Sequence, residues 1–83
     1  MKVTLKKFLD IVGKSFLELW ACEIYVDKYD EDFEKYFPQM EISQLKDISQ
    51  LESYLDYEIY NFKQELEWGE VVKQKIYLKE IAQ

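Results

Sequence analysis

The 83-residue chain has room for a single domain, 1–83, and carries 17 acidic residues against 11 basic ones, for a net charge of −6 at pH 7. All of the basic residues are lysines and no histidine is present. These facts exclude acid–base catalysis by histidine and bidentate binding of phosphate by arginine. A hydrophobic fraction of 48% with only two glycines and one proline excludes a disordered chain.

The negative charge is concentrated in the middle of the chain. Residues 1–14 carry four lysines and one aspartate, net +3, and residues 71–83 carry three lysines and one glutamate, net +2, so residues 15–70 carry −11. Such a field repels nucleic-acid phosphate and attracts a basic protein surface. The alternative is that the acidity only keeps the protein in solution.

The N-terminal third predicts a helix and then a strand. Apolar residues at helical spacing between Thr4, an N-cap residue type, and Gly13 predict a helix. From Leu17 to Val26 the period changes to two and predicts a strand. Its expected inward face comprises Trp20, Cys22, Ile24 and Val26.

A hairpin and a second helix are expected next. Residues 27–32 are polar and turn-prone, and the aromatic stretch 33–37 predicts a strand that Pro38 stops or displaces. Residues 42–56 return to helical spacing, and the capping-box pattern from Ser49 to Glu52 predicts a turn or break near Ser49.

The last third predicts a closing hairpin. Its first strand should be the longest in the chain, and Tyr60, Phe62, Leu66 and Trp68 would share one face of it, with Ile59 on the other. Residues 68–70 can turn the chain. The inward stripe of the final strand is expected to be Val72, Gln74, Ile76 and Leu78.

The expected element order is therefore α-β-β-α-β-β, an α+β fold with about four mainly antiparallel strands and two helices on one face. The opposite face would carry a mixture of charge and aromatic hydroxyls that is either solvated or a docking surface. Its expected residues are Glu23, Tyr25, Lys63, Glu65 and Tyr77.

No catalytic or cofactor-binding motif is predicted, so the chain is expected not to be an enzyme. Cys22 falls on an inward strand face, where a thiol usually packs as a small hydrophobe. The glycines stand alone, so no phosphate-binding loop exists. A frame beginning at Asp30 resembles a calcium loop only until its sixth position, where Lys35 replaces the required glycine. No metal and no cofactor is expected.

Two acidic clusters with aromatic neighbours are the candidate partner-binding sites. Carboxylates steer encounter with a basic surface, and exposed aromatic anchors supply affinity. The alternative for the first cluster is a solvated loop with its aromatic residues turned into the core. If both clusters lay on one side of the molecule, they would imitate the phosphates of a DNA duplex. The candidate residues are Asp27, Tyr29, Asp30, Glu31, Asp32 and Glu34 in the first cluster, and Glu65, Glu67, Trp68 and Glu70 in the second.

The segments Thr4–Val12 and Leu51–Phe62 resemble parts of small proteins carried by phages and conjugative elements of low-GC Gram-positive bacteria. Together they cover about a quarter of the chain, and the resemblance implies a helix and a helix-to-strand junction. Inhibitors of host defence, including anti-CRISPR proteins, occur among such small acidic proteins. By this analogy, the protein is expected to be an inhibitor that blocks the basic nucleic-acid-binding surface of a host defence nuclease, such as a CRISPR effector.

The alternative is a non-enzymatic accessory or regulatory module of a mobile element that forms a homodimer through an exposed strand edge. Neither hypothesis involves direct nucleic-acid binding or a membrane. The single cysteine and the lack of a long apolar run favour the cytoplasm of a bacterial host.

Overall fold

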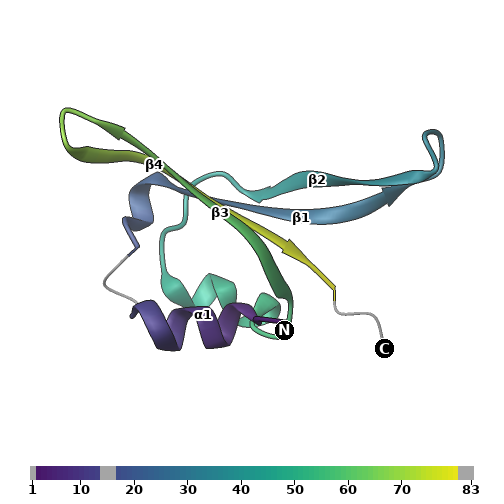
Figure 1. Ribbon diagram of the computed structural model, residues 1–83, viewed down its shortest axis with the longest axis horizontal. Coiled ribbons are helices and arrows are strands. Elements are labelled where there is room, and N and C mark those ends of the chain that lie inside the picture. Colours follow the sequence, from purple (N-terminus) through teal and green to yellow (C-terminus); the bar gives the residue numbers. More distant parts are fainter. Residues whose placement is uncertain (1, 14–16, 81–83) are drawn as a thin grey trace.

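The computed structural model describes residues 2–13 and 17–80, which form a four-stranded mixed sheet with helices below it (Figure 1). The sheet order is β2-β1-β4-β3, and only the central β1–β4 pair is parallel. This architecture confirms the predicted α+β fold and element order. In chain order the elements are α1 (Leu5–Val12), the short 3₁₀ helix η2 (Leu19–Ala21), β1 (Cys22–Asp30), β2 (Lys35–Ile42), the 3₁₀ helix η3 (Ile48–Tyr54), β3 (Glu58–Glu67) and β4 (Glu70–Lys79).

The first helix has the predicted ends. The Lys7 amide donates to the Thr4 hydroxyl at 3.2 Å, so Thr4 is the N-cap, and Gly13 ends the helix with a φ of +81°. Leu5 and Leu9 are the buried residues of α1. They join a core built mainly from the central strands, in a cluster with Leu17, Cys22, Ile24, Val26, Leu45, Leu51, Ile76 and Leu78.

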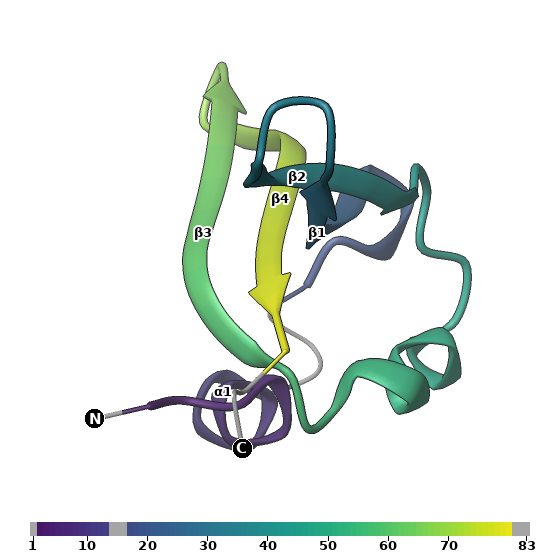
Figure 2. The ribbon, with the colours of Figure 1, turned by 90° about the vertical axis from the view of Figure 1, so that its right-hand side faces the viewer.

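Both α1 and η3 lie on the same side of the sheet (Figure 1). Leu51 of η3 and Leu5 of α1 belong to one buried cluster with Ile24 of β1. Figure 2 shows the strong twist that carries β3 and β4 across β1 and β2. No helix within residues 2–13 and 17–80 covers the opposite face.

The first hairpin is present, but the predicted ends of its two strands are wrong. Residues 19–21 form a turn of 3₁₀ helix, so β1 begins at Cys22 and Trp20 is 61% exposed instead of facing inward. Strand β1 also runs on to Asp30, and β2 continues through Pro38 to Ile42. Pro38 is tolerated because β2 is an edge strand, where a missing amide hydrogen costs no internal ladder bond.

The second helix is present at the predicted place in the chain, but it is shorter than the predicted span 42–56. Ile42 ends β2, and only residues 48–54 are helical, as a 3₁₀ helix. The capping box is formed by Asp47 and Gln50, not by Ser49 and Glu52. The Asp47 carboxylate accepts from the Ser49 amide at 2.8 Å, so this aspartate starts the helix.

The closing hairpin is confirmed, but one face assignment in β3 is wrong. Ile59 pairs with Leu78 and Asn61 with Tyr77, so Tyr60 is an extra residue in a β-bulge. The bulge lets Ile59 and Phe62 both pack against the core. Tyr60 therefore turns to the opposite face, which simple alternation does not foresee. Strands β3 and β4 are equally long, at ten residues each.

Candidate functional site

The first acidic cluster lies on a two-stranded ribbon that projects beyond the core. Pairing of β1 with β4 ends at Val26, whereas pairing of β1 with β2 continues to Asp30. Residues 27–38, here called the acidic arm, therefore have no third described strand beside most of their length, and no described helix lies beneath the tip (Figure 1). Five carboxylates and two lysines give the arm a net charge of −3.

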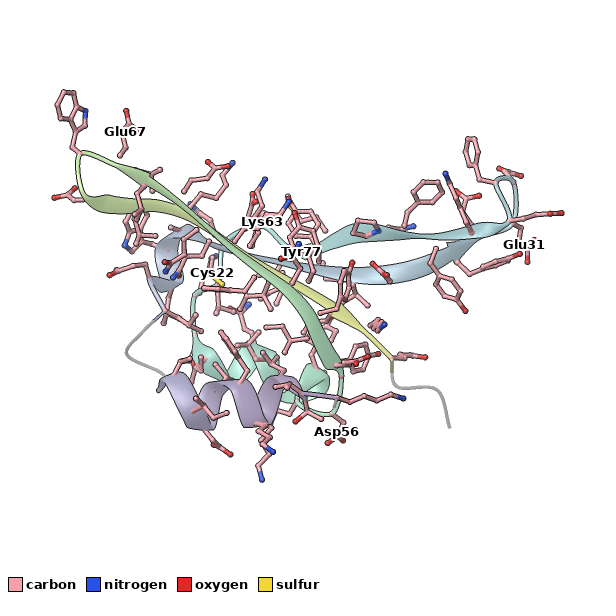
Figure 3. The ribbon with its side chains drawn as sticks, viewed as in Figure 1. Cys22, Glu31, Asp56, Lys63, Glu67 and Tyr77 are labelled. Carbon is pink, nitrogen blue, oxygen red and sulfur yellow. The ribbon has the colours of Figure 1, made fainter. Side chains whose placement is uncertain are left out.

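Two of the arm's five carboxylates, Asp27 and Asp30, accept hydrogen bonds within the protein, and the other three do not. The Asp30 side chain accepts from the amides of Asp32, at 2.9 Å, and Phe33, at 3.4 Å, which closes the turn. Glu31, Asp32 and Glu34 are exposed and have no ion pair or side-chain hydrogen bond with a described residue. Figure 3 shows Glu31 pointing away from the molecule at the arm's tip. These three carboxylates are available to a partner.

The aromatic residues of the arm are not turned into the core. Phe33 is 68% exposed and meets Phe37 edge-on at 5.7 Å between ring centroids, while Tyr29 and Tyr36 form a second edge-on pair at 5.2 Å. Tyr29 and Tyr36 are directly paired across the two strands, and such a pair stabilises a ribbon that lacks a third strand, whereas Phe33 packs from the turn onto Phe37 of β2. Both pairs also leave apolar surface beside the carboxylates, as a contact surface requires.

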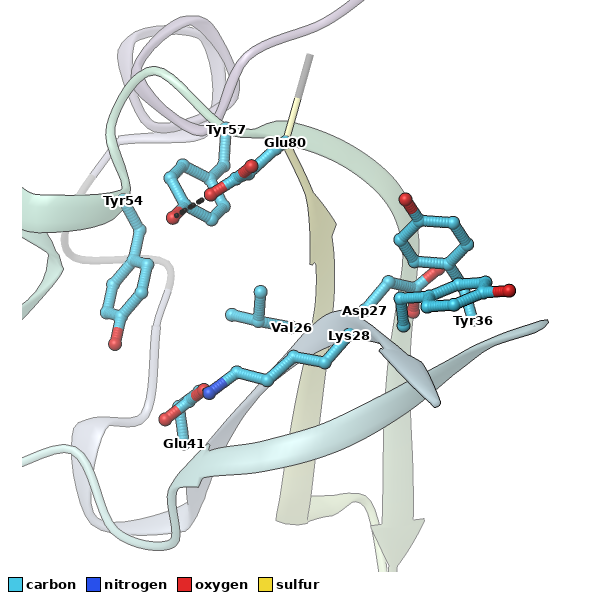
Figure 4. A pocket seen from close by; sticks show the side chains of 9 residues that line it. Val26, Asp27, Lys28, Tyr36, Glu41, Tyr54, Tyr57 and Glu80 are labelled. Carbon is cyan, nitrogen blue, oxygen red and sulfur yellow. Dashed lines mark hydrogen bonds and ion pairs between the residues drawn. The ribbon is translucent and has the colours of Figure 1, made fainter. Parts of the chain in front are cut away.

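The root of the arm borders an open hollow of about 580 Å³ (Figure 4). Its charged side chains are engaged: Lys28 forms an ion pair with Glu41, and the Tyr57 hydroxyl donates to Glu80 at 3.1 Å. The hydrogen bond and charge of Glu41 raise the pKa of Lys28. The Lys28–Glu41 pair joins β1 to β2 at the root of the arm, and the Tyr57–Glu80 bond lies outside the arm.

Across β4 from the arm, the Tyr60 hydroxyl donates a hydrogen bond to the Asp27 carboxylate. Partial burial, followed by this bond, raises the pKa of Tyr60 well above its usual value. Asp27 is thus engaged at the root of the arm, as Asp30 is at the turn, whereas the side chains of Glu31, Asp32 and Glu34 form no hydrogen bond or ion pair with a described residue.

The second cluster lies on the β3–β4 hairpin at the other end of the molecule. Its turn residues Trp68 and Gly69 have φ values of +55° and +79°, as a two-residue type I′ turn requires. Trp68 is 96% exposed. The cluster is also mixed in charge, because Glu65 lies 4.0 Å from Lys75.

The structure brings residues 27–34 together, and likewise residues 65–70, but it does not join the two clusters. They lie toward opposite ends of the longest axis, which is 40 Å (Figures 1 and 3). A continuous DNA-like surface made from both clusters is therefore not formed, and a function of the acidic arm has to rest on that arm alone.

The uncovered sheet face carries an aromatic network that the sequence only partly indicated. The rings of Tyr25 and Tyr77 stack at 4.9 Å, and the Lys63 ammonium lies 5.5 Å above Tyr77. Alternation placed these residues on the outer face correctly. Tyr60 joins them at 6.0 Å from Tyr77 because of the bulge, which no residue pattern in the sequence marks.

The remaining chemistry-bearing groups do not form a second site. Cys22 is buried in the core as predicted, and burial raises the pKa of its thiol to about 11. Within residues 2–13 and 17–80, no group of three or more carboxylate or cysteine side chains is arranged to hold a metal ion. No helix in this part of the chain is long and apolar enough to cross a membrane. Comparisons of the chain with protein-family models, curated proteins and solved structures find no match.

Proposed function

We propose that this protein is a stoichiometric inhibitor from a mobile element, which inserts its acidic arm into a basic nucleic-acid-binding groove of a host defence nuclease in the bacterial cytoplasm. The observation that carries the proposal is the arm itself: a projecting ribbon with three unpaired carboxylates beside exposed aromatic rings.

Charge supports a protein partner. The chain carries a net −6 and the arm −3, so phosphate is repelled, whereas a lysine- and arginine-lined groove concentrates the arm by electrostatic steering. Grooves that accept nucleic acid are lined in this way. Binding should therefore weaken as the salt concentration rises.

Shape supports insertion. Two paired strands are about 5 Å apart, so the arm is narrow compared with the body of the protein. The structure also contains two devices that fix the arm before binding, namely the Asp30 turn and the two aromatic pairs. Such pre-organisation reduces the entropy lost on association.

The test is affinity capture from the lysate of a low-GC Gram-positive host at low and high salt, followed by a cleavage assay with the captured nuclease. The test variant is Glu31→Lys combined with Asp32→Lys, which leaves the Asp30 side chain unchanged. The matched control is Glu52→Lys combined with Asp56→Lys, which changes the net charge equally on the helix side of the molecule (Figure 3).

The arm variant should lose capture and inhibition, and the control should retain most of both. Equal losses in the two variants would mean that only the overall charge matters, and no loss in either would exclude the arm from binding.

A further inference from the structure

The two edges of the sheet differ in how they are protected. Edge strand β2 contains Pro38, which has no amide hydrogen to donate to an added strand, and a proline on an edge discourages such pairing. The pairing of each edge strand with its neighbour contains register shifts, so these do not distinguish the two edges. Edge strand β3 has neither proline nor glycine over its ten residues.

Part of the β3 edge is already occupied. The Ile59 amide donates to the Val3 carbonyl at 2.9 Å, and Thr4 forms an antiparallel bridge with Glu58. Beyond this point, Figure 2 shows no other described element alongside the outer edge of β3. The open stretch is therefore residues 61–67, bounded by the N-terminal segment at one end and by the hairpin turn at the other.

The open stretch is self-complementary about Gln64. Moving one residue in either direction reaches Lys63 and Glu65, which carry opposite charges, and moving two reaches Phe62 and Leu66, which are both apolar. An antiparallel pairing of two identical strands centred on Gln64 would place each residue directly opposite its counterpart. Lys63 would face Glu65 of the second copy, and Phe62 would face Leu66 of the second copy.

The single chain leaves these groups poorly matched. Lys63 lies directly opposite Lys75 on the neighbouring strand, a like-charge pair that destabilises a sheet. Leu66 is 64% exposed although it lies on the same face as Phe62, which packs against Phe8 at 5.3 Å between ring centroids. A second strand would supply a carboxylate for Lys63 and apolar cover for Leu66.

We propose that a second copy of this chain binds along residues 61–67 of β3, antiparallel and in register about Gln64, to form a continuous eight-stranded sheet. Because β2 is the opposite edge of each four-stranded sheet, the two acidic arms would lie at the far ends of the dimer. The dimer interface and the arm are separate surfaces, so this inference stands independently of the proposed function.

The first test is a charge swap measured by sedimentation equilibrium without any partner protein. Lys63→Glu and Glu65→Lys alone each create two like-charge contacts across the interface, and each should weaken dimerisation about tenfold. The double variant, Lys63→Glu with Glu65→Lys, restores opposite charges and should recover most of the affinity. A wild-type protein that is monomeric at every concentration, or a double variant as weak as the single ones, would overturn the proposal.

The second test reads the register directly. Residues directly opposite in an antiparallel pair have Cβ atoms about 4.5–5.5 Å apart, close to the distance that a disulfide spans. Gln64→Cys should therefore form a covalent dimer on mild oxidation, and Gln39→Cys on the β2 edge should not, while Cys22 is buried. Cross-linking that is no faster for Gln64→Cys than for Gln39→Cys would contradict this register.

Discussion

The Tyr60 hydroxyl of β3 and the Asp27 carboxylate of β1 are joined by a hydrogen bond across the intervening strand β4. On the same face, the ring of Tyr77 of β4 lies 6.0 Å from that of Tyr60 and 4.9 Å from that of Tyr25. Asp27 is the first residue of the acidic arm. The bond therefore connects the edge strand β3 to the root of the arm, over a sheet face that none of the described helices covers.

Removing this hydroxyl should loosen the sheet. Tyr60→Phe is expected to lower the free energy of unfolding by about 0.5–1 kcal/mol, in the lower part of the range for a hydrogen bond because Tyr60 is partly exposed. Urea denaturation measures the change. The matched control is Tyr36→Phe, because the Tyr36 ring contacts Tyr29 and its hydroxyl has no hydrogen bond to a described residue.

The contribution of Tyr60 should also depend on pH in a defined direction. Its pKa is raised in the folded protein, so the protonated phenol is favoured there, and its stabilising effect is complete below the ordinary value of 10.0. The difference between wild type and Tyr60→Phe should stay constant through neutral pH and shrink as the pH rises above about 10. A difference that grows at high pH would contradict the assigned bond.

A substitution in the turn of the β3–β4 hairpin should increase the stability of the protein. Trp68 has a φ of +55°, a left-handed conformation that asparagine adopts more easily, and its exposed indole makes almost no packing contact. Trp68→Asn should therefore raise the free energy of unfolding by about 0.5–1 kcal/mol. The measurement belongs at low protein concentration, where self-association does not contribute.

Gly69→Ala tests the same turn with a substitution that should destabilise the protein. A methyl group there would meet no atom within 4 Å, so only the backbone conformation, with φ at +79°, opposes the substitution. A loss of about 1 kcal/mol is expected. If both turn variants were neutral, the turn would not have the conformation described.

The start of η3 should be sensitive to acid. The amide hydrogen bond from Ser49 lowers the pKa of Asp47 below its usual value of 3.8. Its charge therefore stabilises the folded state above that value, and the effect is lost as the pH falls through the lower folded value. Asp47→Asn keeps an accepting oxygen but not the charge. The melting temperature of the wild type should exceed that of the variant at neutral pH, and the gap should close below about pH 4.

Substitutions of Asp30 and of Glu31 should have different effects on the hydrogen exchange of the backbone amides in the turn of the arm. Asp30→Ala removes the acceptor of the Asp32 and Phe33 amides, so both should exchange with solvent faster. Asp30→Asn retains an acceptor and should protect them largely as the wild type does. Glu31→Ala should leave both amides unchanged, and faster exchange in that variant would show that the turn depends on more than Asp30.

Side-chain alternation predicted the central strands well, since Gln74, Ile76 and Leu78 are all buried on one face of β4. It failed where the chain departs from regular geometry. The bulge at Tyr60 reverses the alternation without any marker residue, and the spacing of Ile48 and Leu51 suits a 3₁₀ turn as well as an α-helix.

The sequence identified the acidic arm as a candidate site, but not which of its carboxylates stabilise the turn and which are exposed to a partner. Asp30 and Glu31 are adjacent acidic residues, and only the geometry separates the turn-closing side chain from the exposed one. The sequence also could not place the two acidic clusters at opposite ends, because their separation follows from the mixed strand order and the twist of the sheet.

That strand order has a consequence for how the protein reaches its folded state. β4 is the last strand along the described chain, yet it lies between β1 and β3, and its parallel pairing joins Cys22 to Gln74. The β1–β2 hairpin is a local unit, but no strand pairing links it to β3 until β4 has been added. Closing so long a loop is slow, and assembly of the core therefore waits until residues 70–79 have been synthesised.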